Sequence, residues 1–313
     1  ATAARYGGME PPETVAIVGA GYVGVEMAEA FAAWDLDVHL FQRSGRPVPG
    51  FGDAVGDAVT EHLRESAVTL HFGEEVRRLD GAGGHVDRVV CDDGTELSVD
   101  AALVGIGIRP NTGLLEETPV ELGESGAVAT DEYGRTSLEN VYAAGDVAEM
   151  PHTVTDEPTW NPLGLPANRA GRAIGSTVAG DPEPVGRVSG TAMVKAFDLE
   201  CGRTGLLDHD QAREAGFDPV SETITAGSRS GYYPGAAETT VTLTADRDTG
   251  RLLGGSIVGT DRAAVRIDTI ATALGGGMTV AELERQDLGY APPFSPVWDP
   301  VLVAAKVLNG SLE

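Results

Sequence analysis

Several residue types are scarce in this sequence, and each scarcity excludes a class of protein. Among 313 residues only Cys91 and Cys201 are cysteines, too few for a disulfide framework or a cysteine-based structural zinc site. Aromatic residues make up 5%, and only two of the 22 basic residues, Lys195 and Lys306, are lysines. No run of about 18 apolar residues occurs, which excludes a transmembrane helix. No basic stretch followed by an apolar one opens the chain, so the sequence shows no secretion signal and predicts a cytoplasmic protein.

Charge of one sign dominates the remainder. The 22 basic residues face 48 acidic ones, and 22 − 48 gives a formal charge of −26. Without a basic patch, a nucleic-acid partner is not expected. An acidic, lysine-poor chain is typical of a halophilic cytoplasm, where salt screens the self-repulsion, and it predicts loss of structure below roughly 0.5 M salt. The alternative is an ordinary acidic protein, because net charge reports on solubility and not on fold.

A glycine-rich loop carries the strongest chemical signal. Gly19, Gly21 and Gly24 directly follow an apolar, β-branched segment at 14–18, and an apolar stripe at helical spacing covers 25–34. The next strand is expected at 38–41. In this strand–helix–strand context GxGxxG indicates dinucleotide binding: Gly19 allows the tight turn, Gly21 lets the backbone approach the pyrophosphate, and Gly24 brings helix and strand together.

The residues after the second strand bear on which dinucleotide binds. NAD sites usually place an acid there to accept hydrogen bonds from the ribose. This chain has Gln42 and Arg43, with Arg46 just beyond. A missing carboxylate and a guanidinium favour the 2′-phosphate of NADPH, while NADH remains possible. The alternative is that both arginines are solvated surface charges.

The whole chain has a mixed α/β pattern in three segments. The first closes with a hairpin at 86–99 and a buried strand at 101–106. The second contains a strand at 141–146 that ends in Gly145 and Asp146, followed by a helix at 167–179. The third alternates strands with helices near 262–275, 279–285 and 297–309. No metal-ligand spacing connects the six histidines.

Four motifs in order are more informative than any one of them. They are ETVAIVGAGYVGVEMAEAF at 13–31, GIRPN at 107–111, TSLENVYAAGD at 136–146 and DLGYAPPFSPVWDP at 287–300. Together they closely resemble the FAD-dependent pyridine nucleotide-disulfide oxidoreductases. The last motif resembles the branch of coenzyme A-disulfide reductases and NADH oxidases.

The resemblance implies an α/β architecture with three parts. Residues 1–110 correspond to a Rossmann-like NAD(P)H domain, 111–186 to the returning half of the FAD domain, and 187–313 to an α+β domain that forms a homodimer. The family begins with another glycine-rich unit for FAD and a redox cysteine, and about 100–150 residues, one such half, are expected to be missing here. Neither Cys91 nor Cys201 stands at the family's cysteine position, so both are expected to be structural.

The flavin site is carried over residue by residue. Asp146 is expected to hydrogen-bond the ribityl or diphosphate part of FAD, with Gly145 allowing close approach; the alternative for Asp146 is a turn cap. A helix starting near Ala167 would direct its positive end at the flavin pyrimidine. The resemblance also assigns Glu26 and Gly107 to the cofactor site, Glu26 near the nicotinamide, although Glu26 is equally well explained as a first-turn acid.

Two tyrosines complete the expected site. In coenzyme A-disulfide reductases, tyrosines in the contexts of Tyr233 and Tyr290 reach across the dimer toward the partner's reactive cysteine. A phenol can donate a hydrogen bond to a thiolate or leaving sulfur without ionising. Tyr233 is preferred to Tyr232 because it directly precedes Pro234. The alternative for each is an aromatic residue of the interface with a satisfied hydroxyl.

The implied activity is hydride transfer from NADPH to FAD, and then electron transfer to a small disulfide such as coenzyme A disulfide, a role in redox homeostasis. An oxidase that passes the electrons to oxygen is the alternative within the same fold. A dimeric nucleotide-binding module without turnover is the alternative outside it.

Overall fold

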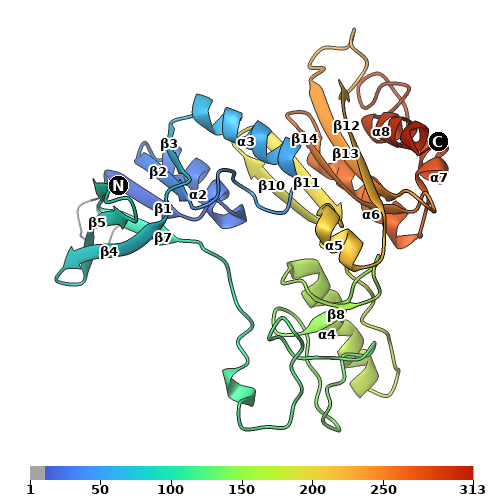
Figure 1. Cartoon of the computed structure of the whole chain (residues 1–313), viewed down its shortest axis with the longest axis horizontal. Helices are drawn as coiled ribbons and strands as arrows, with labels where there is room; N and C mark the ends of the chain where they lie inside the picture. The colour runs from blue at the N-terminus through green and yellow to red at the C-terminus, as the bar shows by residue number, and fades with distance from the viewer. Residues whose placement is uncertain (1–10, 313) are drawn as a thin grey trace. The chain divides into compact units, whose positions relative to one another are not determined.

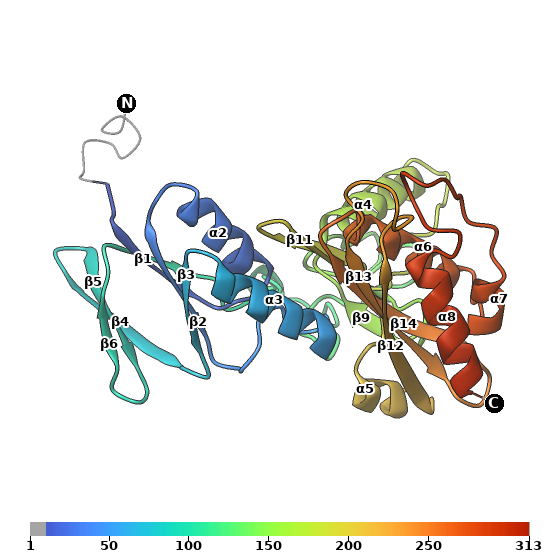
Figure 2. The same cartoon turned by 90° about the horizontal axis from the view of Figure 1, so that it is seen from above.

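The computed structural model describes residues 11–312, which divide into two compact units (Figures 1 and 2). The first unit contains residues 11–107 with the short segments 194–201 and 258–260, and the second contains the other described residues. None of the helices described in either unit is long and apolar enough to cross a membrane.

A parallel four-stranded sheet in the order β3-β2-β1-β7 forms the centre of the first unit. The three antiparallel strands β4-β5-β6 connect β3 to β7 where a crossover helix is usual. The elements are β1 (Thr14–Val18), α2 (Tyr22–Ala32), β2 (Asp37–Gln42), α3 (Asp53–Glu65), β3 (Val68–Phe72), β4 (Val76–Ala82), β5 (His85–Cys91), β6 (Glu96–Ser98) and β7 (Ala101–Val104).

Packing in the first unit follows the strand period of two. Ala16 and Phe41 are buried against Val89, Cys91 and Val99 of the small sheet. The helix α3 buries its own apolar stripe at helical spacing. The expectation of a buried strand over 101–106 is wrong in extent and burial: β7 ends at residue 104, and its side chains are half-buried or exposed. As an edge strand, β7 has a sheet neighbour only on the side of β1.

The first half of the second unit is mostly irregular and contains η1 (Gly113–Leu115), β8 (Glu149–Pro151), β9 (Pro158–Trp160) and α4 (Gly164–Val178). The strand expected at 141–146 is absent. Among the described residues, its backbone forms only one isolated β-bridge, between Arg135 and Tyr142. The helix expected to start near Ala167 begins three residues earlier, at Gly164. Pro166 does not prevent this, since proline is tolerated in a first helical turn.

A five-stranded sheet in the order β10-β11-β14-β13-β12 forms the C-terminal part. Its elements are β10 (Ala192–Ala196), β11 (Leu199–Gly205), α5 (His209–Glu214), β12 (Pro219–Gly227), β13 (Glu238–Asp246), β14 (Leu252–Gly259), η2 (Ala264–Arg266), α6 (Ile267–Gly275), α7 (Val280–Glu284) and α8 (Pro300–Ser311). The helices expected in this segment are all present, within a few residues of the expected bounds.

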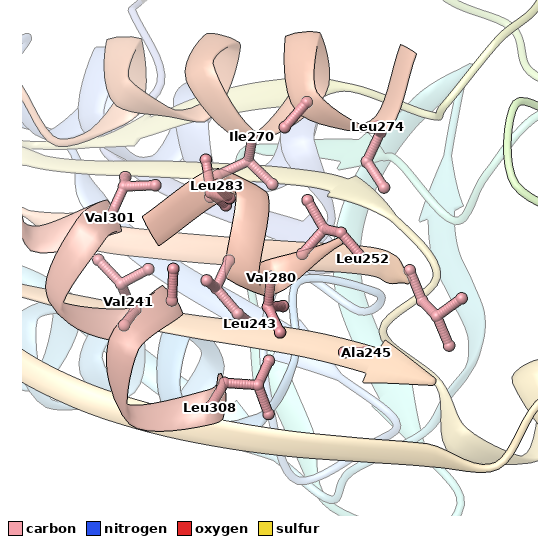
Figure 3. Packing of buried hydrophobic residues seen from close by; sticks show 14 of the residues in the cluster. Val241, Leu243, Ala245, Leu252, Ile270, Leu274, Val280, Leu283, Val301 and Leu308 are labelled. Atoms are coloured by element: carbon pink, nitrogen blue, oxygen red, sulfur yellow. The ribbon is translucent and has the colours of Figure 1, made fainter. Parts of the chain in front are cut away.

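Alternation along β13 separates the two faces of this sheet. Val241, Leu243 and Ala245 are fully buried in one cluster with residues of α6, α7 and α8 (Figure 3). On the other face the hydroxyl groups of Thr240 and Thr242 lie 2.9 and 2.8 Å from those of threonines on β12. The apolar face therefore anchors the three C-terminal helices and fixes the register of the strands that carry them.

Candidate functional site

The glycine loop after β1 is shaped by backbone contacts that exclude side chains. Gly19 has φ +103°, and a Cβ atom there would lie 2.4 Å from the carbonyl oxygen of Gly105. A Cβ on Gly24 would lie 1.8 Å from the carbonyl oxygen of Gly19. Both positions thus require glycine for packing, and they bring the carboxyl ends of β1 and β7 to the start of α2.

Gly21 differs from the other two glycines. A Cβ there would meet nothing within 4 Å, so the loop is open at this point. Gly21 is also the N-cap of α2, and no side chain caps the first-turn N–H groups. Free N–H groups at a helix N-terminus, beside an open backbone, suit the negative charge of a diphosphate. The described residues therefore fit a dinucleotide here.

Gln42 performs a role that its sequence position did not reveal. Its Oε1 accepts the N–H of Ala20 at 2.9 Å, and its Nε2 donates to the Ser44 hydroxyl at 2.7 Å. The Ser44 hydroxyl in turn donates to the carbonyl oxygen of Arg46 at 3.0 Å. One amide thus joins the glycine loop to the loop after β2. The sequence signal was an amide at a strand end where an acid is usual, but its two partners required the structure.

The two arginines of this loop have different surroundings. Arg46 pairs with two acids of α3, Nη1 lying 2.6 Å from Asp53 and Nε 2.6 Å from Asp57. The hydrogen bond to Asp57, followed by the charge of Asp53, raises the pKa of Arg46 above its ordinary value. Arg43 is exposed and has no hydrogen-bond or ion-pair partner among residues 11–312. Arg43 is therefore the guanidinium available to a ligand.

Two further predicted residues of the first unit are open to solvent. Glu26 is exposed on α2, and its carboxylate has no partner among the described residues. The alternative of a first-turn acid is wrong, because α2 begins at Tyr22 and its first turn contains no acid. Gly107 has φ +109° and would meet nothing within 4 Å if it carried a Cβ. Neither residue contributes to the packing of the unit, and their assignment to a cofactor remains a prediction.

In the second unit, the loop containing Gly145 and Asp146 lies against α4. Gly145 has φ +79°, and a Cβ there would lie 3.5 Å from the Cβ of Ala167. Asp146 is exposed, and no described residue pairs with its carboxylate. Its carbonyl oxygen accepts the indole N–H of Trp160 at 2.8 Å. Trp160 was missed by the sequence analysis, since nothing in its local sequence indicates this contact.

The N-terminus of α4 resembles that of α2 in its electrostatics. Its N-cap is Leu163, which offers no side-chain acceptor. Ala167 lies in the first turn, beside Gly145. A free carboxylate for a hydroxyl, a glycine for close approach and an uncapped 15-residue helix fit one part of a flavin nucleotide.

The two predicted tyrosines lie on separate segments of the second unit, and both are exposed. Tyr233 is 37% and Tyr290 49% exposed, while neighbouring Tyr232 is 78% exposed. The N–H of Tyr233 donates to the carbonyl oxygen of Ser230 at 2.8 Å within a tight turn after β12. Tyr290 lies on the irregular segment that leads to α8.

Both cysteines are buried and free. Burial, followed by the charges of Glu74, Asp93 and Asp92, raises the pKa of Cys91 to about 11. Burial and the charge of Glu200 raise the pKa of Cys201 to about 12. Both thiols therefore stay protonated near neutral pH, which opposes nucleophilic chemistry. No cluster of His, Cys, Asp and Glu within residues 11–312 could hold a metal ion.

The chain is similar to proteins of one family along almost its whole length. It is 42% identical over 298 residues to the NAD(P)H coenzyme A polysulfide/persulfide reductase of Pyrococcus horikoshii, covering 95% of this chain and 66% of the relative. The chain thus spans less than two thirds of that relative's length. A NAD-dependent persulfide reductase structure from A. fulgidus shares 35% identity at a TM-score of 0.92, covering 96% of this chain and 56% of that one.

A second similar structure is an engineered water-forming NADPH oxidase, bound to NADPH and derived from a Lactobacillus brevis NADH oxidase. It shares 26% identity at a TM-score of 0.87, covering 97% of this chain and 67% of that one. The family model for pyridine nucleotide-disulphide oxidoreductases matches residues 1–159, and that for their dimerisation domain matches 191–300. Fold, glycine loop and these matches agree with the resemblance seen in the motifs: the chain belongs to the pyridine nucleotide-disulphide oxidoreductase family.

Proposed function

We propose that this chain serves in a NADPH-dependent flavoprotein that reduces a small disulfide or persulfide of coenzyme A. The observation that carries the proposal is the 42% identity, over 298 residues, to a protein named as a coenzyme A polysulfide/persulfide reductase. The hydride of one NADPH and one proton from solvent convert one disulfide into two thiols. When bound, FAD supplies the two-electron relay between the pyridine nucleotide and the disulfide.

The residues take the following roles in the proposal. Gly21 and the start of α2 bind the diphosphate of NADPH, between Gly19 and Gly24, with Gly107 at the same edge of the sheet. Gly145, Asp146 and Ala167 hold part of FAD, and Glu26 lies by the nicotinamide. Tyr233 and Tyr290 donate hydrogen bonds to the sulfur atoms of the substrate or its leaving thiolate. Neither cysteine of the chain is proposed as the nucleophile, because burial raises the pKa of both.

The preference for NADPH rests on the loop after β2. In the engineered NADPH oxidase three consecutive residues, Asp, Ala and Met, were changed to Ala, Arg and Ser. The run Gln42, Arg43 and Ser44 likewise lacks the acid and has arginine followed by serine. We assign the 2′-phosphate contact to Arg43, which is free. Arg46 is already paired with Asp53 and Asp57, and these ion pairs disfavour a contact with the phosphate. Its contact with the phosphate stays a prediction.

The decisive test is the stoichiometry of the protein purified from its complete reading frame. With FAD bound and oxygen removed, one NADPH consumed per coenzyme A disulfide, with two thiols released, would support the proposal. NADPH consumption that requires oxygen and does not depend on the disulfide would favour the oxidase, the second candidate. Oxidase is the activity named for the engineered NADPH oxidase structure. A colourless protein that binds NADPH without turnover would favour the nucleotide-binding module.

The quaternary state and the cellular setting belong to the same proposal. The match to the dimerisation domain supports a homodimer formed through residues 187–313, with the division at 110 and 186 retained as the proposed domain boundaries.

The charge of −26 supports a halophilic, cytoplasmic protein. We expect its melting temperature to rise steeply from low salt to molar KCl, because salt screens the repulsion. A melting curve independent of KCl would contradict the halophilic assignment.

A further inference from the structure

One arginine connects the two segments that carry the tyrosines. The side chain of Arg266 is 10% exposed and lies at the end of η2. Its Nη2 donates to the carbonyl oxygen of Ser228 at 2.6 Å and to that of Phe294 at 3.1 Å. Ser228 opens the turn that contains Tyr233, and Phe294 lies four residues after Tyr290. A single nitrogen therefore holds both segments.

The remaining donors of Arg266 anchor this bridge to the core. Nε donates to Asp299, the N-cap of α8, at 2.9 Å. Nη1 donates to the carbonyl oxygens of Asp261 at 3.3 Å and Arg262 at 3.0 Å. Five acceptors thus match the five N–H donors of a guanidinium, whose planar fork fixes their directions. A lysine ammonium has three donors at one point and cannot span the same acceptors.

A second ion pair, between Arg229 and Asp261, also holds the Tyr233 turn. Asp261 accepts the Ser228 hydroxyl at 2.6 Å and Arg229 Nε at 2.7 Å, and Arg229 Nη2 completes the bidentate pair. Arg229 Nη1 also reaches the carbonyl oxygen of Pro234 at 3.4 Å, directly after Tyr233. The hydrogen bond from Arg229 is the main cause that lowers the pKa of Asp261, so this carboxylate is ionised at neutral pH.

We infer that Arg266 is a positioning residue that fixes the Tyr233 turn and the Tyr290 segment relative to each other at the disulfide-reducing site. This inference rests on the proposed function and extends it to a residue that touches neither substrate nor cofactor. The phenols of Tyr233 and Tyr290 are exposed. The backbone of the segments that carry them is held by the Arg266 guanidinium, whose five N–H donors are all used. Loss of the bridge should misplace both phenols while the hydrophobic core stays intact.

The test compares Arg266→Lys with the wild type in the complete, FAD-loaded protein, with Arg213→Lys as the matched control. Arg213 forms an exposed pair with Asp210 at 2.8 Å on α5. In Arg266→Lys, amide hydrogen exchange in peptides 228–237 and 291–299 should accelerate at least about tenfold, because the loss of bonds from a charged group opens both segments. Exchange in β13 and β14 should be unchanged. The control should match the wild type throughout.

Kinetics provide the second readout. In Arg266→Lys, kcat with coenzyme A disulfide should fall at least about tenfold, while the KM for NADPH and NADPH oxidation by ferricyanide, which bypasses the tyrosines, stay unchanged. Equal acceleration of exchange in β13 and β14, or an equal loss with ferricyanide, would mean a merely structural role and overturn the inference. Unchanged exchange in either tyrosine segment would also overturn it.

Two arms keep the outcomes distinct. If the wild type does not reduce coenzyme A disulfide, the proposed function fails, and hydrogen exchange alone decides whether Arg266 ties the two segments. If Arg266→Lys does not fold, Asp261→Asn replaces it: exchange should then accelerate in 228–237 and remain slow in 291–299, because Arg266 still holds Phe294. Acceleration in both segments, or in neither, would contradict the arrangement.

Discussion

The glycine loop of the first unit and the tyrosine segments of the second unit are held in opposite ways. Close backbone contacts that forbid a Cβ shape the glycine loop, between Gly24 and Gly19 and between Gly19 and Gly105, which follows β7. The tyrosine segments depend on partly buried side chains from positions 228 to 299, joined through Arg266 and Asp261. The first arrangement depends on the close approach of backbone atoms, and the second on a network of side chains whose members act together.

Alanine substitution in the glycine loop offers the strongest test of this contrast. Gly24→Ala should lower the free energy of unfolding by about 3 kcal/mol or more, because its Cβ meets the Gly19 carbonyl. Gly21→Ala should change the melting temperature little, since space is open there, yet weaken NADPH binding by about a hundredfold by blocking the approach of the diphosphate. Calorimetric titration and thermal melts separate the two. Equal effects of both variants on melting would refute the distinction between packing and ligand glycines.

Acid unfolding tests the ion pair of Asp261 in the network that holds the tyrosine segments. The pKa of Asp261 is below its ordinary value, so its stabilisation is present above the ordinary carboxyl pKa and is lost as the pH falls through the lower pKa of the folded state. Asp261→Asn should cost about 2 kcal/mol at pH 7 and much less at an acid pH below the lowered pKa of the folded state, measured by urea unfolding across pH. A cost that is the same at both pH values would show that the ion pair is not the source.

Coenzyme choice sharpens the description of the first unit. Arg43→Gln should lower the ratio of kcat/KM for NADPH to that for NADH by about 10- to 100-fold, the value of a charge-assisted contact to phosphate. Arg46→Gln is the matched control: it should reduce stability slightly by removing its ion pairs, with the ratio preserved. If Arg46→Gln changes the ratio as much as Arg43→Gln, both guanidinium groups contact the phosphate.

The smallest effect is expected at the cysteines, which belong neither to the glycine loop nor to the tyrosine segments. Cys91→Ser should leave turnover unchanged, and the native thiols should react with iodoacetamide at pH 8 at least about a hundredfold more slowly than free cysteine, because burial raises the pKa of both. Mass spectrometry of alkylated peptides measures this. Rapid alkylation of Cys201 would mean that the strand bearing it opens readily.

The same contrast explains how much could be predicted from sequence. The loop from Gly19 to Gly24 was readable because strand, turn and helix signals lie within one short stretch. The strand expected at 141–146 failed because a strand needs a paired neighbour, which an apolar run does not provide by itself. The pairing of Arg46 with α3 and the hydrogen bonds of Arg266 to Ser228 and Phe294 depend on the path of the chain between residues distant in sequence. Periodicity carries no information about that path.

Gln42 links coenzyme choice to the shape of the loop that makes the choice. Gln42→Glu would supply the ribose acceptor typical of NAD sites, and its carboxylate could still accept the Ala20 N–H. It could not donate to Ser44, whose hydroxyl would then turn toward the new carboxylate and release the Arg46 carbonyl. A change of coenzyme at Gln42 therefore also changes the hydrogen bonds of Ser44, so the acceptor for the ribose and the shape of the loop cannot be altered independently.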